Sequence, residues 1–135
     1  MTAEAFIDTN VLVYYFDQDE PHKQERAKQV LLDVEPVLSA QVLSEFYWTV
    51  TRKLARPVDP ADAERAVAEW ARFRVIPLTA SLVKNAVQTG RRHQLSHWDA
   101  LILEAAAAGG CEELLTEDLA DGAVLRGVRI RNPFV

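Results

Sequence analysis

The sequence predicts an α/β protein, a three-layer α/β/α sandwich around a mostly parallel sheet of four or five strands. Short apolar segments alternate with longer segments whose apolar residues recur every three or four positions, and this alternation is typical of strands joined by helices. No linker, repeat or low-complexity tract interrupts the series. The chain has 135 residues, 49% of them apolar, which matches the usual size of one folding unit with its own core. We therefore expect residues 1–135 to form a single domain.

The first half of the chain contains two strands, each followed by helical segments. The apolar run over residues 5–7 predicts a strand, residues 8–10 a polar turn and residues 11–16 a helix. Apolar residues at three- and four-residue spacing predict an amphipathic helix over residues 22–34. A brief strand over residues 36–39 then leads to another helix. The expected core side of that helix consists of Leu43, Tyr47, Val50 and Leu54.

The middle of the chain is predicted to form a helix and a third strand. Asp59 can cap a helix that has Pro60 at its first position and runs to about Arg72. Residues 74–78 predict a strand. Because proline lacks a backbone N–H, Pro77 can occupy only the end of this strand or an unpaired side of it.

Two helices are expected next. Thr79 can cap the first, and its expected buried residues are Leu82, Val83, Ala86 and Val87. Ser96, with an acid three residues later, has capping-box spacing for a second helix that runs through Ala108. This helix is apolar on nearly all sides and should therefore be buried. The two glycines at residues 109–110 should end it.

Two further short strands are expected near the C-terminus, over residues 113–116 and 128–130. In a parallel sheet with helices on both faces, ligands bind outside the carboxyl ends of the strands, where the strand order reverses. Asp8 follows the first strand, and Asp118 follows the fourth. The predicted topology therefore places these two acids beside a crevice.

Composition excludes several classes of protein. The net charge of −5 argues against a chain that coats nucleic acid non-specifically, because that affinity comes from many Lys and Arg contacts to phosphates. The single cysteine, Cys111, cannot form an internal disulfide, which favours a reducing cytoplasm. The most apolar segment, residues 98–110, is interrupted by acids and is too short to cross a bilayer. The N-terminus lacks the features of a secretion signal, so we expect a cytoplasmic protein that does not bind membranes.

Each candidate acid also has a structural interpretation. Asp8 could cap the following helix, and Asp118 could lie in a solvated turn beside Glu117, which is an alternative candidate. Asp99 has the spacing of a capping-box acid. Glu45 lies away from the expected core side of its helix and, taken alone, is typical of a solvated residue. The case for a shared site therefore depends on the arrangement, with two acids at strand ends and two in the first turns of helices.

Convergence of the four acids would imply a metal ion. Their mutual repulsion would raise the pKa of some of them unless a cation were present. An all-oxygen ligand set selects a hard divalent ion, so Mg²⁺ is expected, with Mn²⁺ as the alternative. Such an ion can polarise a phosphoryl oxygen and activate a bound water for attack on phosphorus, without a nucleophilic side chain. The predicted chemistry is therefore cleavage of a phosphodiester.

The four acids lie in short segments that follow one another in a recognisable order. The segments are residues 6–13, 44–46, 97–100 and 115–119, which contain Asp8, Glu45, Asp99 and Asp118. In this order they resemble the acidic motifs of PIN domains, and specifically of VapC-like toxins of bacterial toxin–antitoxin pairs. The ending over residues 127–134 is similar as well. The likeness spans the whole chain, and four ordered acids are more specific than any one motif.

The resemblance has implications for fold, activity and partners. It implies a parallel α/β/α sandwich and a magnesium-dependent endoribonuclease that is a homodimer and is held inactive by a cognate antitoxin. It assigns the metal ligands, and thereby the catalytic role, to Asp8, Glu45, Asp99 and Asp118. It gives Asn10 and Thr116 a supporting role through hydrogen bonds.

Two groups of basic residues could contact an RNA backbone. One lies within residues 52–56, and the other, residues 91–93, directly precedes the helix that carries Asp99. Cations at the C-terminal ends of helices also complement the helix dipole, and we favour this interpretation for the first group. Arg91 and Arg92 remain the candidate RNA contacts.

Two other functions compete with a nuclease. The first is a phosphatase or phosphotransferase with Asp8 as the nucleophile, as in haloacid dehalogenase-like enzymes. Those enzymes have an aspartate two residues after the nucleophile, where this chain has Asn10. The second is a non-catalytic module of similar fold that binds RNA or a partner protein. Four acids argue against this module, because clustered carboxylates do not favour an anion unless a cation intervenes.

Overall fold

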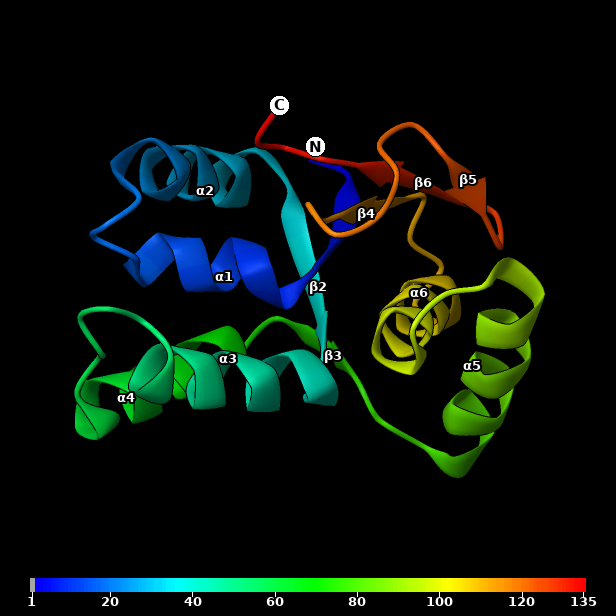
Figure 1. The fold of residues 1–135 in the computed structure, drawn as a ribbon, viewed down its shortest axis with the longest axis horizontal. Coiled ribbons are helices and arrows are strands. Elements are labelled where there is room, and N and C mark those ends of the chain that lie inside the picture. The colour runs from blue at the N-terminus through cyan, green and yellow to red at the C-terminus, as the bar shows by residue number, and fades with distance from the viewer. Residues whose placement is uncertain (1) are drawn as a thin grey trace.

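A computed structural model describes residues 2–135 and shows six strands and six helices within them (Figure 1). The strands are β1 (Glu4–Ile7), β2 (Glu35–Ser39), β3 (Arg74–Ile76), β4 (Glu113–Leu115), β5 (Val124–Leu125) and β6 (Val128–Arg131). The helices are α1 (Thr9–Phe16), α2 (Pro21–Asp33), α3 (Ala40–Arg52), α4 (Pro60–Trp70), α5 (Ala80–His93) and α6 (His97–Ala108). The predicted alternation of strands and helices is confirmed.

The strands form one sheet in the order β3-β2-β1-β4-β6-β5. All neighbouring strands are parallel except β5 and β6. From β1 the chain adds β2 and then β3 on one side, and it adds β4 on the other side. The strand order therefore reverses at β1, which puts a switch point between the carboxyl ends of β1 and β4. Ile7 and Leu115 face each other at these ends.

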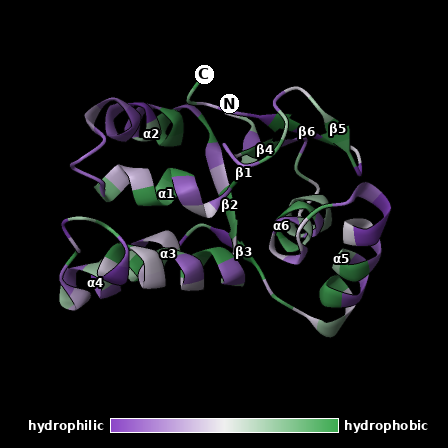
Figure 2. Ribbon diagram, viewed as in Figure 1, coloured by the Kyte–Doolittle hydropathy of each residue, from purple (hydrophilic) through white to green (hydrophobic). Residues whose placement is uncertain are grey.

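Helices cover both faces of the sheet (Figure 1). Helices α1 to α4 lie on one side, α6 lies on the other, and α5 packs on the outside of α6. The predicted burial of α6 is confirmed, and even its charged residue Glu104 is buried. In Figure 2, α6 is mostly green or white, whereas α2 is largely purple. Among the helices of residues 2–135, none combines the length and apolar character needed to span a membrane.

Several helices begin where the sequence predicts. The side chains of Asp59, Thr79 and Ser96 each accept a hydrogen bond from a backbone N–H in the first turn of the following helix. Such a cap stabilises a helix by about 1 kcal/mol. Pro77 lies just beyond the end of β3, as the missing N–H of proline requires. Helix α1 begins at Thr9, two residues earlier than predicted, because Asp8 itself is the N-cap.

The predicted core side of α3 is wrong. Its buried apolar residues are Val42, Phe46 and Val50, whereas Tyr47 is exposed and Leu43 is only partly buried. Both stripes have helical spacing and share Val50, so periodicity alone does not distinguish them. The true core side lies next to Glu45, which is therefore half-buried instead of solvated.

Two further differences concern the C-terminal half. Val87 of α5 is exposed although we predicted that it is buried, and Thr89, three residues after Ala86, continues the buried side of the helix instead. The sheet also has one more strand than expected, because β5 pairs with β6 through a two-residue turn. Arg126 and Gly127 both have positive φ, at 53° and 76°. Two positive φ angles are what a type I′ turn requires.

Candidate functional site

Asp8 lies at the switch point, directly after β1, and its side chain is only 5% exposed. Its Oδ1 accepts a hydrogen bond from the backbone N–H of Thr9 at 2.6 Å, and its Oδ2 accepts one from the hydroxyl of Thr116 at 2.8 Å. Asp8 therefore caps α1 and also occupies the end of the strand. The capping interpretation of this residue is confirmed, and the cap leaves Asp8 at the predicted strand end.

Thr116 connects three polar residues of the site. It follows β4 and is 0% exposed. Its hydroxyl donates to Asp8 and accepts from the backbone N–H of Asp118 at 3.0 Å and from Nδ2 of Asn10 at 3.3 Å. The same Asn10 amide donates to Oδ2 of Asp118 at 3.1 Å. The loops after β1 and β4 are thus joined by one hydrogen-bond network that includes two of the predicted acids.

The neighbouring acid Glu117 has other partners. Its carboxylate accepts a hydrogen bond from the hydroxyl of Tyr14 and pairs with Lys23 at 3.0 Å. Lys23 also donates to the Tyr14 hydroxyl at 3.1 Å. These contacts fix the loop after β4 to α1 and α2. The geometry therefore associates Asp118, and not Glu117, with the network around Asp8.

The other two acids lie on α3 and α6. Nε2 of Gln41 donates both to Glu45 and to the backbone carbonyl of Trp98, the latter at 3.4 Å. This bridge joins the N-terminal halves of α3 and α6, which carry Glu45 and Asp99. The backbone N–H of Asp99 donates to the hydroxyl of Ser96 at 3.1 Å, so the predicted helix cap is present. Both acids are half-buried.

Burial and neighbouring acids change the ionisation of the site. Burial is the main reason that the pKa of Asp8 is raised from 3.8 to about 7, against the hydrogen bonds from Thr116 and Thr9. The charges of Asp118 and Glu45 raise the pKa of Asp8 further. The pKa of Asp99 is also raised, first by burial and then by the charge of Asp118. The charge of Asp118 therefore acts on both Asp8 and Asp99, and the charge of Glu45 acts on Asp8.

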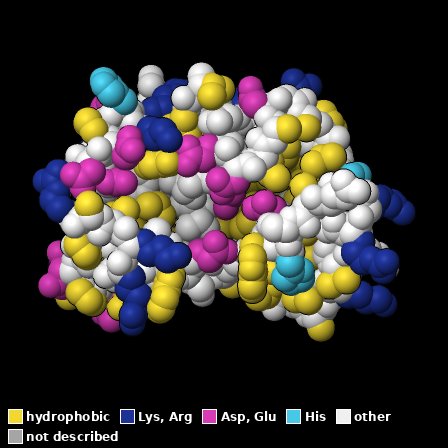
Figure 3. All heavy atoms as spheres, in the orientation of Figure 1, with side chains coloured by type: hydrophobic (Ala, Val, Ile, Leu, Met, Phe, Trp, Pro, Cys, Tyr) yellow, Lys and Arg dark blue, Asp and Glu magenta, His cyan; other side chains and the backbone are white. Residues whose placement is uncertain are grey.

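The acids share one region but do not form a tight cage. Figure 3 shows Asp and Glu side chains gathered in the middle of one face, between the half with α1 to α4 and the half with α5 and α6. Among residues 2–135, no three His, Cys, Asp or Glu side chains are arranged to hold a metal ion as they stand. Asp118 is exposed. Convergence on a single ion therefore requires some side chains to rotate.

The donor chemistry of the region suits a hard divalent cation. All four acids supply oxygen atoms, which Mg²⁺ and Mn²⁺ prefer. In addition, Oδ1 of Asn10 and Oγ1 of Thr9 are buried and have no hydrogen-bond partner among residues 2–135. A buried oxygen without a partner calls for a water or an ion beside it. The group of carboxylates and the two oxygens without a hydrogen-bond partner both fit a hydrated cation at this place.

Some contributors to the site were not expected from the sequence. Gln41 holds Glu45, and the pair formed by Tyr14 and Lys23 holds Glu117. Only Gln41 has a signal in the sequence, because it lies four residues before Glu45 and so on the same side of a helix.

The candidate RNA contacts Arg91 and Arg92 lie apart from the acids. Both are exposed in the last turn of α5. They line a hollow between α5, α6 and the turn that joins β5 to β6, and none of the four acids lines it.

The fold and the site define an α/β/α protein with carboxylates grouped at the switch point of a parallel sheet. The model of one family, described as the PIN domain, matches residues 5–120. The chain therefore belongs to the PIN domain family. A search of curated proteins found no match to this sequence.

Solved structures of similar fold cover nearly the whole chain. A toxin–antitoxin complex from Klebsiella pneumoniae matches with a TM-score of 0.71 and 22% identity, covering 96% of this chain and 97% of that chain. VapC20 from Mycobacterium tuberculosis, described as a sarcin–ricin loop cleaving toxin, has a TM-score of 0.64 and 21% identity over 82% of this chain and 86% of that one. VapBC2 from Rickettsia felis, bound to a promoter DNA fragment, has a TM-score of 0.64 and 16% identity, with 96% and 98% coverage. At these identities the likeness establishes the fold.

Proposed function

We propose that this protein is a metal-dependent endoribonuclease and the toxin of a toxin–antitoxin pair. The observation that carries the proposal is the buried carboxyl of Asp8, whose pKa is raised to about 7 beside the charges of Asp118 and Glu45. A buried acid surrounded by acids at a switch point calls for a cation. Membership of the PIN domain family supports a nuclease, since toxins of the VapC type in this family are nucleases in general.

The four acids would share the work of holding the ion. Asp8, Glu45, Asp99 and Asp118 are the proposed ligands of Mg²⁺ or Mn²⁺. When bound, the ion would supply Lewis acidity and lower the pKa of a coordinated water. Thr116 and Asn10 keep the carboxylates of Asp8 and Asp118 in place through the hydrogen bonds described above. Gln41 does the same for Glu45.

We further propose a protein partner for this chain. The solved structures of similar fold include a toxin–antitoxin complex and a VapBC pair bound to promoter DNA. These support a cognate antitoxin that inhibits the nuclease. We also propose that the chain is a homodimer, as the sequence resemblance implies, and that it is cytoplasmic, as its single cysteine favours.

The proposal predicts metal-dependent cleavage of RNA. The purified chain should degrade total RNA in the presence of Mg²⁺ or Mn²⁺ and should stop when EDTA is added, because chelation leaves the carboxylates without their cation. Gel electrophoresis of the products measures this directly. The variant Asp33→Asn is a suitable control, since Asp33 is an exposed acid on α2 and its substitution should change nothing.

Two other experimental outcomes would support one of the competing functions instead of a nuclease. RNA that is bound but left intact with Mg²⁺ would indicate a binding module. Phosphate trapped covalently on Asp8 would indicate a phosphotransferase. Either result in a preparation that does not cleave RNA would reject the nuclease.

Glu117 and Asp118 should differ in their importance. Glu117→Gln removes the ion pair with Lys23 but leaves the network of Asp8 untouched. We expect it to cleave RNA within about threefold of the wild-type rate and to lose about 1 kcal/mol of stability at most, because the pair is partly exposed. Single-turnover cleavage and thermal melting measure the two effects. A loss of cleavage by Glu117→Gln as large as that of Asp118→Asn would assign the metal to Glu117 instead.

A further inference from the structure

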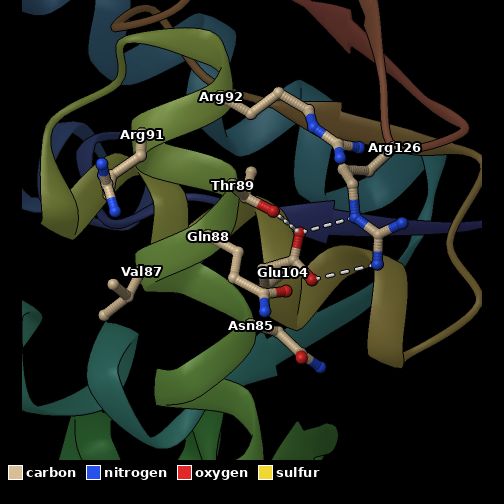
Figure 4. Close-up of a pocket in the computed structure, with 8 residues that line it drawn as sticks. All are labelled: Asn85, Val87, Gln88, Thr89, Arg91, Arg92, Glu104 and Arg126. Carbon is tan, nitrogen blue, oxygen red and sulfur yellow. Dashed lines mark hydrogen bonds and ion pairs between the residues drawn. The ribbon is translucent and has the colours of Figure 1, made fainter.

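A hollow of about 620 Å³ lies on the side of the molecule formed by α5, α6 and the turn between β5 and β6 (Figure 4). Its walls include three arginines, Arg91, Arg92 and Arg126, and one acid, Glu104. The amides of Asn85 and Gln88 complete a mostly polar lining. In a protein of net charge −5, this hollow carries an excess of two positive charges. We call it the arginine hollow.

Arg126 is held rigidly at the edge of the arginine hollow. Its Nε and Nη2 donate to the two oxygens of Glu104 at 2.9 and 3.2 Å. Glu104 is 3% exposed and also accepts the hydroxyl proton of Thr89 at 2.8 Å. The guanidinium group has five N–H donors, so this pairing leaves several of them for a ligand. A bidentate pair of this kind orients the arginine before any ligand arrives.

The other two arginines carry charges that no acid neutralises. Within residues 2–135, neither Arg91 nor Arg92 forms an ion pair. Figure 4 shows Arg92 extending toward Arg126, whereas Arg91 points to the opposite side of α5. Arg92 and Arg126 therefore line one hollow whose only carboxylate is that of Glu104. Such an arrangement attracts an anion with several oxygens, and phosphate fits the planar fork of arginine.

The position of the hollow relative to the acids indicates which phosphate it would take. Glu104 lies five residues after Asp99 on α6, about 7.5 Å along the helix and about 140° around it. The two places therefore lie on different sides of the same helix. A nucleic acid that reaches both must run across α6, and the phosphate in the hollow is not the one that is cleaved.

Building on the proposed function, we propose that the arginine hollow binds a backbone phosphate of the RNA substrate at a distance from the cleaved bond. Arg92 and Arg126 grip the phosphate, and Glu104 keeps Arg126 in position. Recognition of the backbone carries no sequence information. The hollow therefore contributes affinity and register, and it acts equally on RNA and DNA of the same sequence.

The test compares variants that remove the same charge in different places. Arg91→Gln/Arg92→Gln removes two unpaired cations of α5, of which Arg92 is the one that extends toward Arg126, and it leaves the pair of Arg126 with Glu104 intact. Arg52→Gln/Arg72→Gln is the control for the loss of two charges, because it removes two exposed cations near the C-terminal ends of α3 and α4, of which Arg72 is paired with Glu69. If the arginines of α5 serve only the helix dipole, both double variants should lose a similar amount of thermal stability and neither should lose affinity for RNA.

Binding is measured by fluorescence anisotropy with a short single-stranded RNA in EDTA, so that cleavage does not interfere. Each contact between a cation and a phosphate contributes about 0.7 to the slope of log K against log salt for single strands, so the hollow variant, which loses the contact of Arg92, should lose about 0.7. We expect it to bind RNA several-fold more weakly than the control variant. Arg92→Gln should account for more of this loss than Arg91→Gln. An RNA with a neutral methylphosphonate backbone should not distinguish the variants.

Equal affinity and equal salt slope for the hollow variant and the control would overturn the proposal. So would an unchanged affinity for RNA together with weaker binding of an oligoglutamate peptide, which would assign the hollow to an acidic protein partner. Failure of the proposed function is a separate result. In that case the wild-type chain would not cleave RNA with Mg²⁺, whatever the variants do in EDTA.

Discussion

Asp8→Asn should abolish RNA cleavage and, unusually for an active-site change, should make the metal-free protein more stable above neutral pH. Loss of cleavage follows because the variant lacks the buried carboxylate proposed to hold the ion. The gain in stability follows from burial. Asp8 is 5% exposed and lies near the charges of Asp118 and Glu45, so its ionised form is unfavourable in the folded protein.

The direction of the pH dependence follows from the two pKa values. The pKa of Asp8 is about 7 in the folded protein and has an ordinary value of 3.8. Between these values the unfolded chain releases its proton while the folded protein retains it, so the free energy of unfolding falls as pH rises. The loss is complete above pH 7 and amounts to about 4 kcal/mol at most. Asparagine carries no charge and avoids this loss.

Melting temperatures in EDTA at pH 5 and pH 8 measure the effect. At pH 5 the wild type and Asp8→Asn should be closer, because the folded protein still holds the proton of Asp8 and less than half of the loss has developed. At pH 8 the variant should be the more stable by about 1–3 kcal/mol, since it avoids most of the loss described above but changes the hydrogen bond with Thr116. The control Asp33→Asn should melt like the wild type at both values.

Adding Mg²⁺ should reverse the order of stability. A ligand that binds only the folded state stabilises it, and a metal that needs a deprotonated carboxylate does so more strongly at high pH. Mg²⁺ should therefore raise the melting temperature of the wild type more at pH 8 than at pH 5 and should have little effect on Asp8→Asn. Retained cleavage by Asp8→Asn, or an equal response of both proteins to Mg²⁺, would remove Asp8 from the metal site.

The positions of Asp8 and Asp118 could be predicted from the sequence because local patterns determine them. Each follows a short apolar segment, and parallel strands bring their carboxyl ends to one edge. Capping chemistry is equally local, and Asp59, Thr79 and Ser96 are the N-caps in the structure. In these cases the residues adjacent in the sequence determine where the side chain lies.

The core side of α3 and the partners of the acids could not be predicted in this way. The stripe with Tyr47 and the stripe with Phe46 are both periodic, and only packing against α1 and α4 makes Phe46 the buried one. Likewise, the contact between Thr116 and Asp8 joins residues 108 positions apart. The side-chain pairing of Arg126 with Glu104 depends on a turn with positive φ that has no strong sequence signal. Such contacts arise from the assembled sheet.

Thr116→Val is the second change for which we expect a large effect, because one hydroxyl serves three partners. Valine nearly preserves the volume of threonine, so the fully buried position stays filled. However, Asp8 loses a donor, and the backbone N–H of Asp118 and the amide of Asn10 lose an acceptor. Leaving a buried polar group without a partner costs about 1–3 kcal/mol. The carboxylates of Asp8 and Asp118 would no longer be held relative to each other.

The expected result is a loss of cleavage of about 10–100-fold, the usual effect of removing a group that orients a metal ligand. The Thr116 hydrogen bond lowers the pKa of Asp8, so without it the pH at which cleavage is half-maximal should move upward. More Mg²⁺ should also be needed for half-maximal rate. Thr116→Ser keeps the hydroxyl and loses only a methyl group, so it should restore the pH profile and the Mg²⁺ requirement.

The serine variant separates positioning from packing. A merely structural role for Thr116 would lower stability in both variants but leave the pH profile and the Mg²⁺ requirement of the folded fraction unchanged. If Thr116→Val shows the wild-type pH profile, the hydroxyl does not tune Asp8, and the network at the switch point only holds two loops together. A shift in Thr116→Val that is absent in Thr116→Ser means that the hydroxyl itself sets the ionisation on which metal binding depends.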